Sequence, residues 1–553
     1  MKRSLLSLLL VSFLGQALFA QNLYQEHFPK VDSILNHHYN KNTPGIALSI
    51  ISTGKTIYQN AIGMADMENE IAISDSTSFH IASVSKQFTA YLALLLEEEG
   101  KLSMEDDIRK YLPELEALPY KITLYQLANH THGLPNLSEL VHLKGIGSQN
   151  IMTHQQVIKM LLNIRIVNFK AGEQYQYNNT GFALLAEIIE RVEGLPFQQV
   201  LKERIFNPEG MNASQAIDDP ALIVKNRARS YMLVEDGYQN NELNLMTNGS
   251  SGIRTTIADL SNWAIKFQQP DPKAQAIFQK MQKPSQLNSG QSISYGLGLE
   301  TKKYKGLEVV FHGGGDVGYR SYILHIPAYQ LSLVLLSNTD DFAPLLVYDI
   351  IDLFLKDVLK EPTKPEKTHY SSKELKSFEG TYQMFPGNYF NIIAKHDTLY
   401  FQNYGTKDIA PLPIIGDDEF LFPYIPTTKF SFYENGFIFN IADFKYDCKK
   451  VQLETVKAEE IDLSEYIGIY KNEEFNVFFE LLIEDKELKA RHMRMEDISL
   501  HPIEDDSFFS RRSFFGKLDF DRDKEGKIIA FRVSGQNLMN IEFFKLGCFQ
   551  SSK

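Results

Sequence analysis

The sequence predicts an α+β fold followed by an all-β tail, and three observations support this prediction. Runs of β-type residues stand near the start of the chain and again in its middle, at 45–51, 56–62, 295–301, 307–312, 319–326 and 331–337. The long stretch between these two groups has mainly helical patterns, so strands from both ends of one domain can form a single mixed sheet beside packed helices. After about residue 370 the pattern changes to short alternating strands with turn signals, as in all-β regions.

Four helices are predicted in the first region. The segments 26–39 and 181–192 carry apolar residues at helical spacing, and the segment 343–356 closes the region. The segment 87–99 is apolar nearly all round, which is typical of a buried helix. Gly100 follows it directly, and a glycine just past a helix suits a left-handed cap.

The tail repeats itself. Residues 378–382 (Phe-Glu-Gly-Thr-Tyr) match residues 466–470 (Tyr-Ile-Gly-Ile-Tyr), and residues 440–448 match residues 540–548 in order and rough spacing. Two copies of one unit of this length suit two small antiparallel barrels or sandwiches. A polar segment with two prolines, 360–367, is typical of a linker before them. The predicted organisation is therefore a signal peptide (1–20), a first domain (21–360), a linker (361–370) and two repeats (371–457 and 458–553).

Composition and charge limit the classes of function. The chain has 553 residues, of which 43% are hydrophobic and 23% charged, as in ordinary globular proteins. Lys2 and Arg3, an apolar run at 5–14 and Ala20 before Gln21 predict a cleaved signal peptide, and therefore a periplasmic or secreted protein with no membrane span. Cleavage leaves 54 basic and 69 acidic residues, a net charge of about −15, which argues against nucleic acid or an anionic membrane as a partner.

The stretch before the buried helix carries a candidate nucleophile. Ser83 and Lys86 are three residues apart at the start of this helix, so they lie on one face. A serine hydroxyl needs a base beside it, and burial and the helix N-terminus favour the neutral lysine that could be that base. A second Ser-x-x-Lys at 52–55 lies between two strands, where a hairpin turn is expected.

Two further motifs contain candidate partners of Ser83. Tyr177-Asn178-Asn179 lies on a loop just before a helix, where a phenol can relay a proton and an amide can hold a carbonyl group. His312-Gly313-Gly314-Gly315 stands at the end of a β-run. A strand edge offers backbone N–H groups, and glycines let a substrate approach them closely.

These three motifs, in this order, resemble those of the serine β-lactamase-like hydrolases, the branch with class C β-lactamases, DD-carboxypeptidases, D-aminopeptidases and related esterases. The stretches 122–135, 251–260 and 295–298 are also similar to this family, and the resemblance covers about residues 28–359. It implies a mixed α/β sandwich in which an antiparallel sheet is joined to an all-helical subdomain. Lipocalin-like β-domains follow the hydrolase domain in some D-aminopeptidase-like members, where they can cap the active site. A passive, stabilising tail is the equal alternative.

The resemblance also implies roles for single residues. Ser83 attacks a carbonyl group, Lys86 and Tyr177 move protons, Asn179 orients the substrate amide, the backbone N–H groups of Ser83 and Gly315 form an oxyanion hole beside Gly314, and His312 occupies the first position of the third motif. Histidine there, in place of the usual lysine, is more similar to the D-aminopeptidase and esterase-like members. His132 stands where the family often has serine.

Other kinds of site fit the sequence less well. Residues 313–318 match Gly-x-Gly-x-x-Gly, but a strand follows them where a dinucleotide site needs a helix. The His-Gly-Gly-Gly run resembles an α/β-hydrolase oxyanion loop, but no Gly-x-Ser-x-Gly elbow follows. The histidine pairs 37/38 and 130/132 have no further ligands around them, so neither a metal nor another cofactor is expected.

The sequence therefore predicts an exported serine hydrolase that acts through an acyl-enzyme on small amides or esters. D-amino-acid peptides and carboxylic esters are the favoured substrates, and β-lactams are a further candidate. The alternative is a non-catalytic penicillin-sensing or partner-binding protein with the same fold. The sequence leaves open the oligomeric state and whether Cys448 and Cys548 form a disulfide.

Overall fold

The computed structural model describes residues 24–147, 150–269, 271–340, 345–360, 369–422, 428–441, 444–453 and 461–547. The predicted signal peptide, most of the predicted linker, the boundary between the two predicted repeats and Cys548 lie outside these ranges. The chain forms two compact units. The first comprises Met1–Leu134 and Ser148–Glu361, and the second comprises Pro135–Gly147 and Pro362–Lys553.

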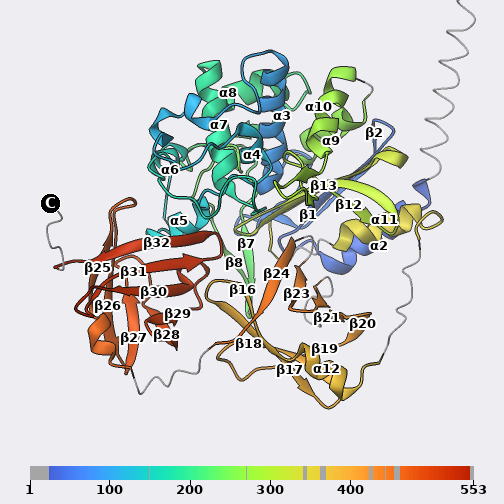
Figure 1. Ribbon diagram of the computed structural model, residues 1–553. Coiled ribbons are helices and arrows are strands. Elements are labelled where there is room, and N and C mark those ends of the chain that lie inside the picture. Colours follow the sequence, from blue (N-terminus) through green and yellow to red (C-terminus); the bar gives the residue numbers. More distant parts are fainter. Residues whose placement is uncertain are drawn as a thin grey trace, which may run out of the picture. The chain divides into compact units, whose positions relative to one another are not determined.

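The first unit is built on a six-stranded antiparallel sheet (Figure 1). Its strands, in spatial order, are β12 (Glu300–Tyr304), β13 (Leu307–Asp316), β14 (Tyr319–Ile326), β15 (Leu331–Ser337), β1 (Ile46–Ser52) and β2 (Lys55–Ile62). The two N-terminal strands join the four later ones through the pairing of β1 with β15, as the sequence predicts. All seven residues of β1 are buried, because helices cover both faces of the sheet.

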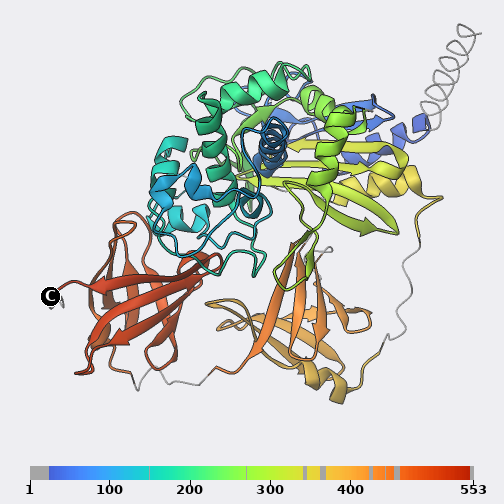
Figure 2. The ribbon, with the colours of Figure 1, turned by 45° about the horizontal axis from the view of Figure 1, so that its top comes forward.

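Helices lie on both sides of this sheet (Figures 1 and 2). On one side α2 (Phe28–His38) and α11 (Leu345–Leu355) pack on alternate strand residues and form a core that includes Leu35, Leu48, Leu333 and Ile350. On the other side α9 (Ile257–Gln268) contacts β1 and β15. The buried helix α3 (Ser85–Glu98) contacts α10 (Pro272–Gln282) and α7 (Asn179–Glu193).

The remaining helices of the first unit form the predicted helical part, with α4 (Leu124–Ala128), α6 (His154–Leu161) and α8 (Phe197–Leu201) around α7. Small sheets complete the unit: β5 (Phe79–His80), β9 (Ile253–Thr255) and β6 (Gln215–Ala216); β3 (Met64–Asp66) and β4 (Ile71–Ala72); β7 (Tyr231–Val234) and β8 (Gly237–Asn240); and β10 (Ser285–Gln286) and β11 (Ser292–Ile293).

Two predicted strands differ from the structure. The strand predicted at 295–301 is wrong, because β12 begins only at Glu300 and the residues before it form a loop. Gly298 in this loop has φ +70°, and a Cβ there would lie 2.9 Å from the Lys86 carbonyl oxygen, so the loop needs glycine to pack on α3. The strand predicted to end at residue 312 continues to Asp316, since the three glycines pair in register with β14.

The second unit contains the two predicted all-β copies. The first copy is a barrel-like sheet of nine strands whose two end strands, β19 and β20, are joined by Pro413 alone. Its strands are β16 (Gly380–Phe385), β17 (Asn388–Lys395), β18 (Thr398–Asn403), β19 (Ala410–Leu412), β20 (Ile414–Gly416), β21 (Glu419–Leu421), β22 (Lys429–Tyr433), β23 (Gly436–Ile441) and β24 (Phe444–Val451), after helix α12 (Ser372–Phe378).

The second copy is a closed eight-stranded barrel. Its strands are β25 (Gly468–Asn472), β26 (Val477–Glu484), β27 (Glu487–Arg491), β28 (Ile498–Glu504), β29 (Ser507–Phe509), β30 (Lys517–Arg522), β31 (Ile528–Gly535) and β32 (Leu538–Lys545). Within the second unit, the inserted helix α5 (Leu137–Leu143) contacts the turn Ser513–Phe515 of this barrel, and the Asn136 N–H donates to the Asn537 carbonyl oxygen at 3.0 Å.

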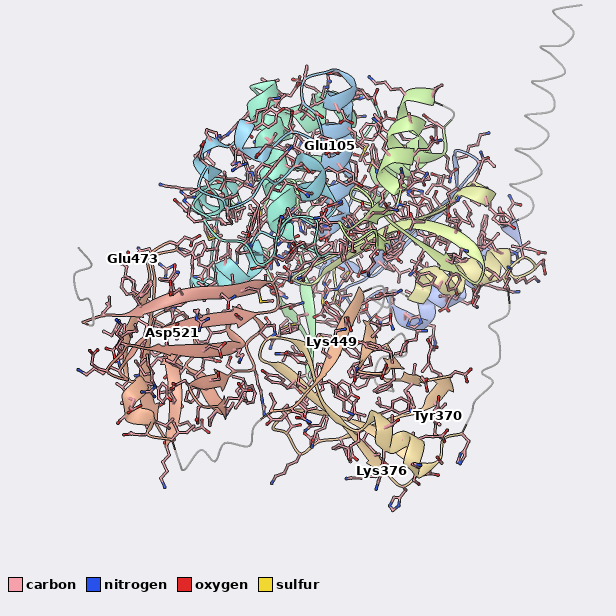
Figure 3. All side chains as sticks on the ribbon, in the orientation of Figure 1. Glu105, Tyr370, Lys376, Lys449, Glu473 and Asp521 are labelled. Carbon is pink, nitrogen blue, oxygen red and sulfur yellow. The ribbon has the colours of Figure 1, made fainter. Side chains whose placement is uncertain are left out.

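The two copies share a matching contact. The Tyr382 hydroxyl donates to the Phe378 carbonyl oxygen at 2.7 Å, and the Tyr470 hydroxyl donates to the Tyr466 carbonyl oxygen at 2.9 Å. In the first copy, the hydroxyl group of Tyr370, which precedes Phe378 in the chain, donates to an Asp418 carboxylate oxygen at 3.0 Å (Tyr370 is labelled in Figure 3). The tyrosines 382 and 470 are the last residues of the two matching sequence stretches, so the repeat that the sequence predicts is also a repeat of structure.

Two smaller findings bear on the remaining predictions. Cys448 is a buried free thiol whose pKa is raised by burial to about 12. Across the part of the chain that the structure describes, no helix is long and apolar enough to cross a membrane.

Candidate active site

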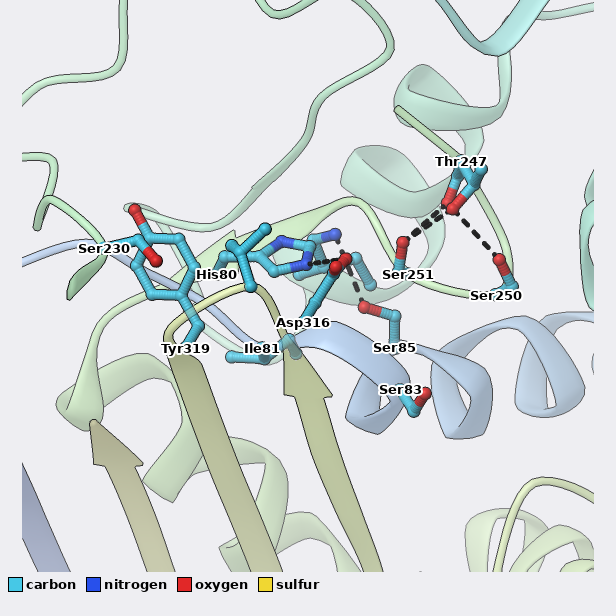
Figure 4. A network of polar contacts seen from close by, with 12 residues as sticks. His80, Ile81, Ser83, Ser85, Ser230, Thr247, Ser250, Ser251, Asp316 and Tyr319 are labelled. Atoms are coloured by element: carbon cyan, nitrogen blue, oxygen red, sulfur yellow. Dashed lines mark hydrogen bonds and ion pairs between the residues drawn. The ribbon is translucent and has the colours of Figure 1, made fainter. Parts of the chain in front are cut away.

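Ser83 lies in a tight turn between a short strand and a buried helix. The strand β5 pairs with β9, a 3₁₀ turn (Ala82–Val84) follows, and α3 begins at Ser85 (Figure 4). Ala82 has φ +44°, a left-handed conformation that costs a non-glycine residue about 1–3 kcal/mol. Ser83 is partly exposed, whereas its neighbours Ala82 and Val84 are buried. The fold thus presents one hydroxyl group at the end of a buried helix.

Lys86 is fully buried one turn along the chain from Ser83. Its Nζ lies 3.0 Å from Ser83 Oγ, 2.7 Å from Asn179 Oδ1 and 2.9 Å from the Ser250 carbonyl oxygen. Burial lowers the pKa of Lys86 well below its ordinary value, and the charge of Asp316 opposes this shift only in part.

The surroundings of Lys86 suit a neutral amine. Such an amine has two N–H groups and one lone pair, whereas a lysine ammonium has three donors and no acceptor. The two N–H groups match the carbonyl oxygens of Asn179 and Ser250, which can only accept hydrogen bonds. In this neutral form the lone pair is left to accept the proton of the Ser83 hydroxyl group, whose oxygen lies 3.0 Å from Nζ. This arrangement can remove a proton from Ser83.

Tyr177 lies on the other side of the same pair. Its hydroxyl group is hydrogen-bonded to the Ser83 side chain, and Lys86 Nζ lies 4.8 Å from the centre of its ring. Burial raises the pKa of Tyr177 above its ordinary value, although the Ser83 hydrogen bond lowers it in part, so the phenol keeps its proton at neutral pH. It can therefore donate a proton near Ser83.

His312 is buried and neutral. Its Nδ1 lies 2.6 Å from the Gly313 carbonyl oxygen and must donate to it, so Nε2 accepts from the Tyr295 hydroxyl group at 2.9 Å. Burial is the main cause that lowers the pKa of His312 to about 3. The first position of the third motif therefore carries no positive charge at neutral pH.

The glycines of β13 pack directly against the Ser83 turn. A Cβ on Gly314 would lie 2.4 Å from the Ile81 carbonyl oxygen and 3.1 Å from the Ser83 nitrogen, so only glycine fits. Gly315 follows, and it is exposed. The structure therefore brings the predicted site residues to one place: Ser83, Lys86, Tyr177, Asn179, His312, Gly314 and Gly315.

Sequence reasoning missed two residues that support this site. The His130 ring packs on Tyr177 with ring centres 4.4 Å apart and on Tyr295 at 4.5 Å, while its Nδ1 accepts from the Asn178 N–H at 3.2 Å. The sequence places His130 in a histidine pair and in a stretch similar to the family, but neither observation gives it a role in the site. Tyr295 stood at the start of a predicted strand, and its contact with His312 joins residues that are distant in the chain.

Comparison with known proteins gives a consistent set of relatives. A family model described as Beta-lactamase matches residues 28–355. Penicillin-binding protein 4* of Bacillus subtilis (strain 168) is 28% identical over 384 residues, which covers 65% of this chain and 84% of that protein. A D-aminopeptidase of Gluconobacter oxydans (strain 621H) is 27% identical over 340 residues, covering 61% of this chain and 63% of the relative, which is under two thirds of its length.

Solved structures include one with a similar fold along most of the chain. The octameric penicillin-binding protein homologue from Pyrococcus abyssi matches with a TM-score of 0.55 and 22% identity, covering 84% of this chain and 98% of that one. At this identity the likeness shows a shared fold alone. The α+β architecture with its all-β tail is thus the one that the sequence predicts.

Proposed function

The chain belongs to the beta-lactamase family, and from this membership we propose that it is a serine hydrolase that forms an acyl-enzyme on Ser83. The observation that carries the proposal is the 3.0 Å contact between Ser83 Oγ and the buried Lys86 amine, whose pKa is lowered by burial. A serine becomes a nucleophile when a neighbouring base takes its proton, and a lysine can act as that base only when it is neutral. Ser83 and Lys86 form such a pair, and burial shifts Lys86 toward its neutral form.

The residues around this pair suit an acyl transfer in two steps. Ser83 Oγ attacks the substrate carbonyl carbon while its proton passes to Lys86 Nζ, and the backbone N–H groups of Ser83 and Gly315 stabilise the oxyanion. The bond to the leaving group then breaks, and Tyr177 supplies the proton that the leaving group needs, recovering one from Lys86. In the second step water attacks the acyl-enzyme and the same groups return Ser83 to its resting state.

Small amides and esters are the substrates that we propose, with D-amino-acid peptides favoured and β-lactams as a further candidate. Relatives named D-aminopeptidase and penicillin-binding protein support this range. Within this range the neutral His312 favours amides and esters that have no carboxylate, because it supplies no cation to bind one. Lys2, Arg3 and the apolar run after them support export to the periplasm or beyond.

The test is covalent labelling of Ser83. The full chain is incubated with a neutral fluorophosphonate, its intact mass is measured, and the adduct is located by peptide mapping. We expect one adduct, on Ser83, that is absent from Ser83→Ala. If Ser83 stays unlabelled under conditions that label a related hydrolase, the non-catalytic alternative is favoured.

The pH dependence of kcat/KM shows whether Lys86 or His312 is the group whose titration controls the rate. Only neutral Lys86 can accept a proton, so kcat/KM for a neutral ester should rise as the pH rises through the lowered pKa of Lys86. His312, with a pKa of about 3, is neutral throughout this range. The variant His312→Gln should therefore keep the midpoint of this rise to within about 0.3 pH units. A displacement of about one unit or more would assign the titration to His312 instead.

A further inference from the structure

Strand β13 carries a carboxylate on the face that covers the Ser83 turn. Successive residues of a strand point to opposite faces, so His312, Gly314 and Asp316 share one face. Gly314 contacts the Ser83 turn, as the position of its missing Cβ shows. His312 and Asp316 therefore flank the nucleophile from two sides, one toward each end of the strand.

The Asp316 side chain is partly exposed and contacts a buried histidine. Its Oδ2 lies 3.1 Å from His80 Nε2, and Figure 4 shows the two side chains pointing toward one another. The His80 side chain is 1% exposed and that of Asp316 is 33% exposed. Burial lowers the pKa of His80, and the Asp316 contact only partly opposes this, so the imidazole does not neutralise the carboxylate at neutral pH.

One buried cation lies near this pair. Arg254 is opposite His80 in the register of β5 and β9. Its guanidinium group lies 3.3 and 3.4 Å from the Tyr319 hydroxyl group, and the residue is 2% exposed. Arg254 can reduce the cost of burying Asp316, but it cannot meet a substrate. Asp316 therefore offers an accessible negative charge whose field reaches Lys86.

The two flanks of Ser83 correspond to the two parts of a substrate. Tyr177, which would protonate the leaving group, lies on the His312 side, with ring centres 6.3 Å apart. The leaving group must lie within reach of that phenol. The acyl part then extends the other way along β13, toward Asp316. This assignment rests on the function proposed above.

We propose that Asp316 is the counter-ion for a protonated amine on the acyl part of the substrate. The enzyme is then selective for aminoacyl groups over neutral acyl groups of the same size. A carboxylate that is held through one oxygen by His80 and whose side chain is one-third exposed is a fixed acceptor for an ammonium group. His80 acts as a positioning residue, since it touches Asp316 and not the substrate.

Two isosteric esters test this. The 4-nitrophenyl esters of D-alanine and of isobutyric acid differ by an ammonium group in place of a methyl group. We measure kcat/KM from 4-nitrophenolate release at about pH 6.5, where an α-amino group is protonated, and subtract the rate with Ser83→Ala. Asp316→Asn should lower kcat/KM for the D-alanyl ester about 10- to 100-fold and that for the isobutyryl ester less than about threefold.

Two control variants sharpen the comparison. Asp316→Glu keeps the charge and should retain most of the preference for the D-alanyl ester. Asp75→Asn removes one carboxylate from an exposed position of the same unit, where it accepts from Gln59 Nε2, and should change neither rate. The test compares the ratio of kcat/KM for the D-alanyl ester to kcat/KM for the isobutyryl ester between each variant and the unmodified protein. Differences in the intrinsic reactivity of the two esters cancel in this comparison.

The outcomes are distinct. An equal fall for both esters in Asp316→Asn would overturn the proposal, because Asp316 would then only hold the Ser83 turn in place. No change for either ester would overturn it as well. Fluorophosphonate labelling of the same samples tests the role of Asp316 and the proposed function of Ser83 separately. Normal labelling with unchanged selectivity rejects the role of Asp316 alone, whereas loss of labelling in the unmodified protein rejects the proposed function itself.

Discussion

Replacing Lys86 with methionine should lower kcat/KM for a neutral ester by about 10²- to 10⁴-fold, the range that general base catalysis contributes. Methionine has a similar length and no amine, so the Ser83 hydroxyl group loses the acceptor that now lies 3.0 Å away. Tyr177 does not replace it, because the raised pKa keeps this phenol protonated. The rate of fluorophosphonate labelling of Ser83 should fall in parallel with the rate of ester hydrolysis.

The same substitution should not destabilise the fold. The pKa of Lys86 is lowered in the folded protein, so the unfolded chain binds a proton that the folded chain does not, and this costs stability at every pH below the ordinary lysine pKa. Methionine removes that cost and leaves two carbonyl oxygens without a donor. We expect the free energy of unfolding to stay the same or to rise by up to about 2 kcal/mol.

Thermal and denaturant unfolding measure this second effect. Lys101→Met is the matched control, because Lys101 is a more exposed lysine, paired with Glu193, and its replacement should leave activity unchanged. If Lys86→Met retained its activity, Lys86 would not be the base that activates Ser83. A large loss of stability would show instead that Lys86 is charged and paired in the folded protein.

Sequence reasoning locates the main parts of this molecule where local patterns are strong. The strands predicted at 319–326 and 331–337 agree with β14 and β15 residue for residue, because both are rich in aromatic and aliphatic residues and are bounded by turns. Sequence reasoning fails where consecutive glycines replace the side chains whose alternation would indicate a strand. Three glycines in a row carry no alternation of polar and apolar side chains, so the last part of β13 cannot be distinguished from a loop without its partner β14.

Parts of the site depend on contacts between residues far apart in the chain. The Ser83–Lys86 pair is local, and the sequence predicts it. The contacts of Lys86 with Asn179 and the Ser250 carbonyl group, in contrast, join residues that lie 93 and 164 positions apart in the chain. The segment Pro135–Gly147 shows the same limit, since its membership of the second unit follows from contacts with the distant barrel. Such contacts are properties of the fold and have no local signal.

Gly314→Ala should lower kcat for ester hydrolysis by about 10²- to 10³-fold, the cost of losing one oxyanion-hole donor. The added methyl group would lie 2.4 Å from the Ile81 carbonyl oxygen, 2.3 Å from Ser321 Oγ and 3.1 Å from the Ser83 nitrogen. The backbone at Ile81 cannot yield as a flexible side chain would, so β13 must move away from the Ser83 turn. The N–H groups of Ser83 and Gly315 then no longer point to one oxyanion.

Gly313→Ala is the matched control, one residue away on the opposite face of β13. Its Cβ would meet only the Tyr322 ring, at 3.3 Å, and alanine is favoured over glycine in a strand by about 0.5–1 kcal/mol. We expect this variant to keep its activity within about threefold and its unfolding temperature within a few degrees. Unfolding curves of both variants show whether each is folded. If folded Gly314→Ala hydrolysed esters as fast as folded Gly313→Ala, close packing of β13 on the Ser83 turn would have no part in the reaction.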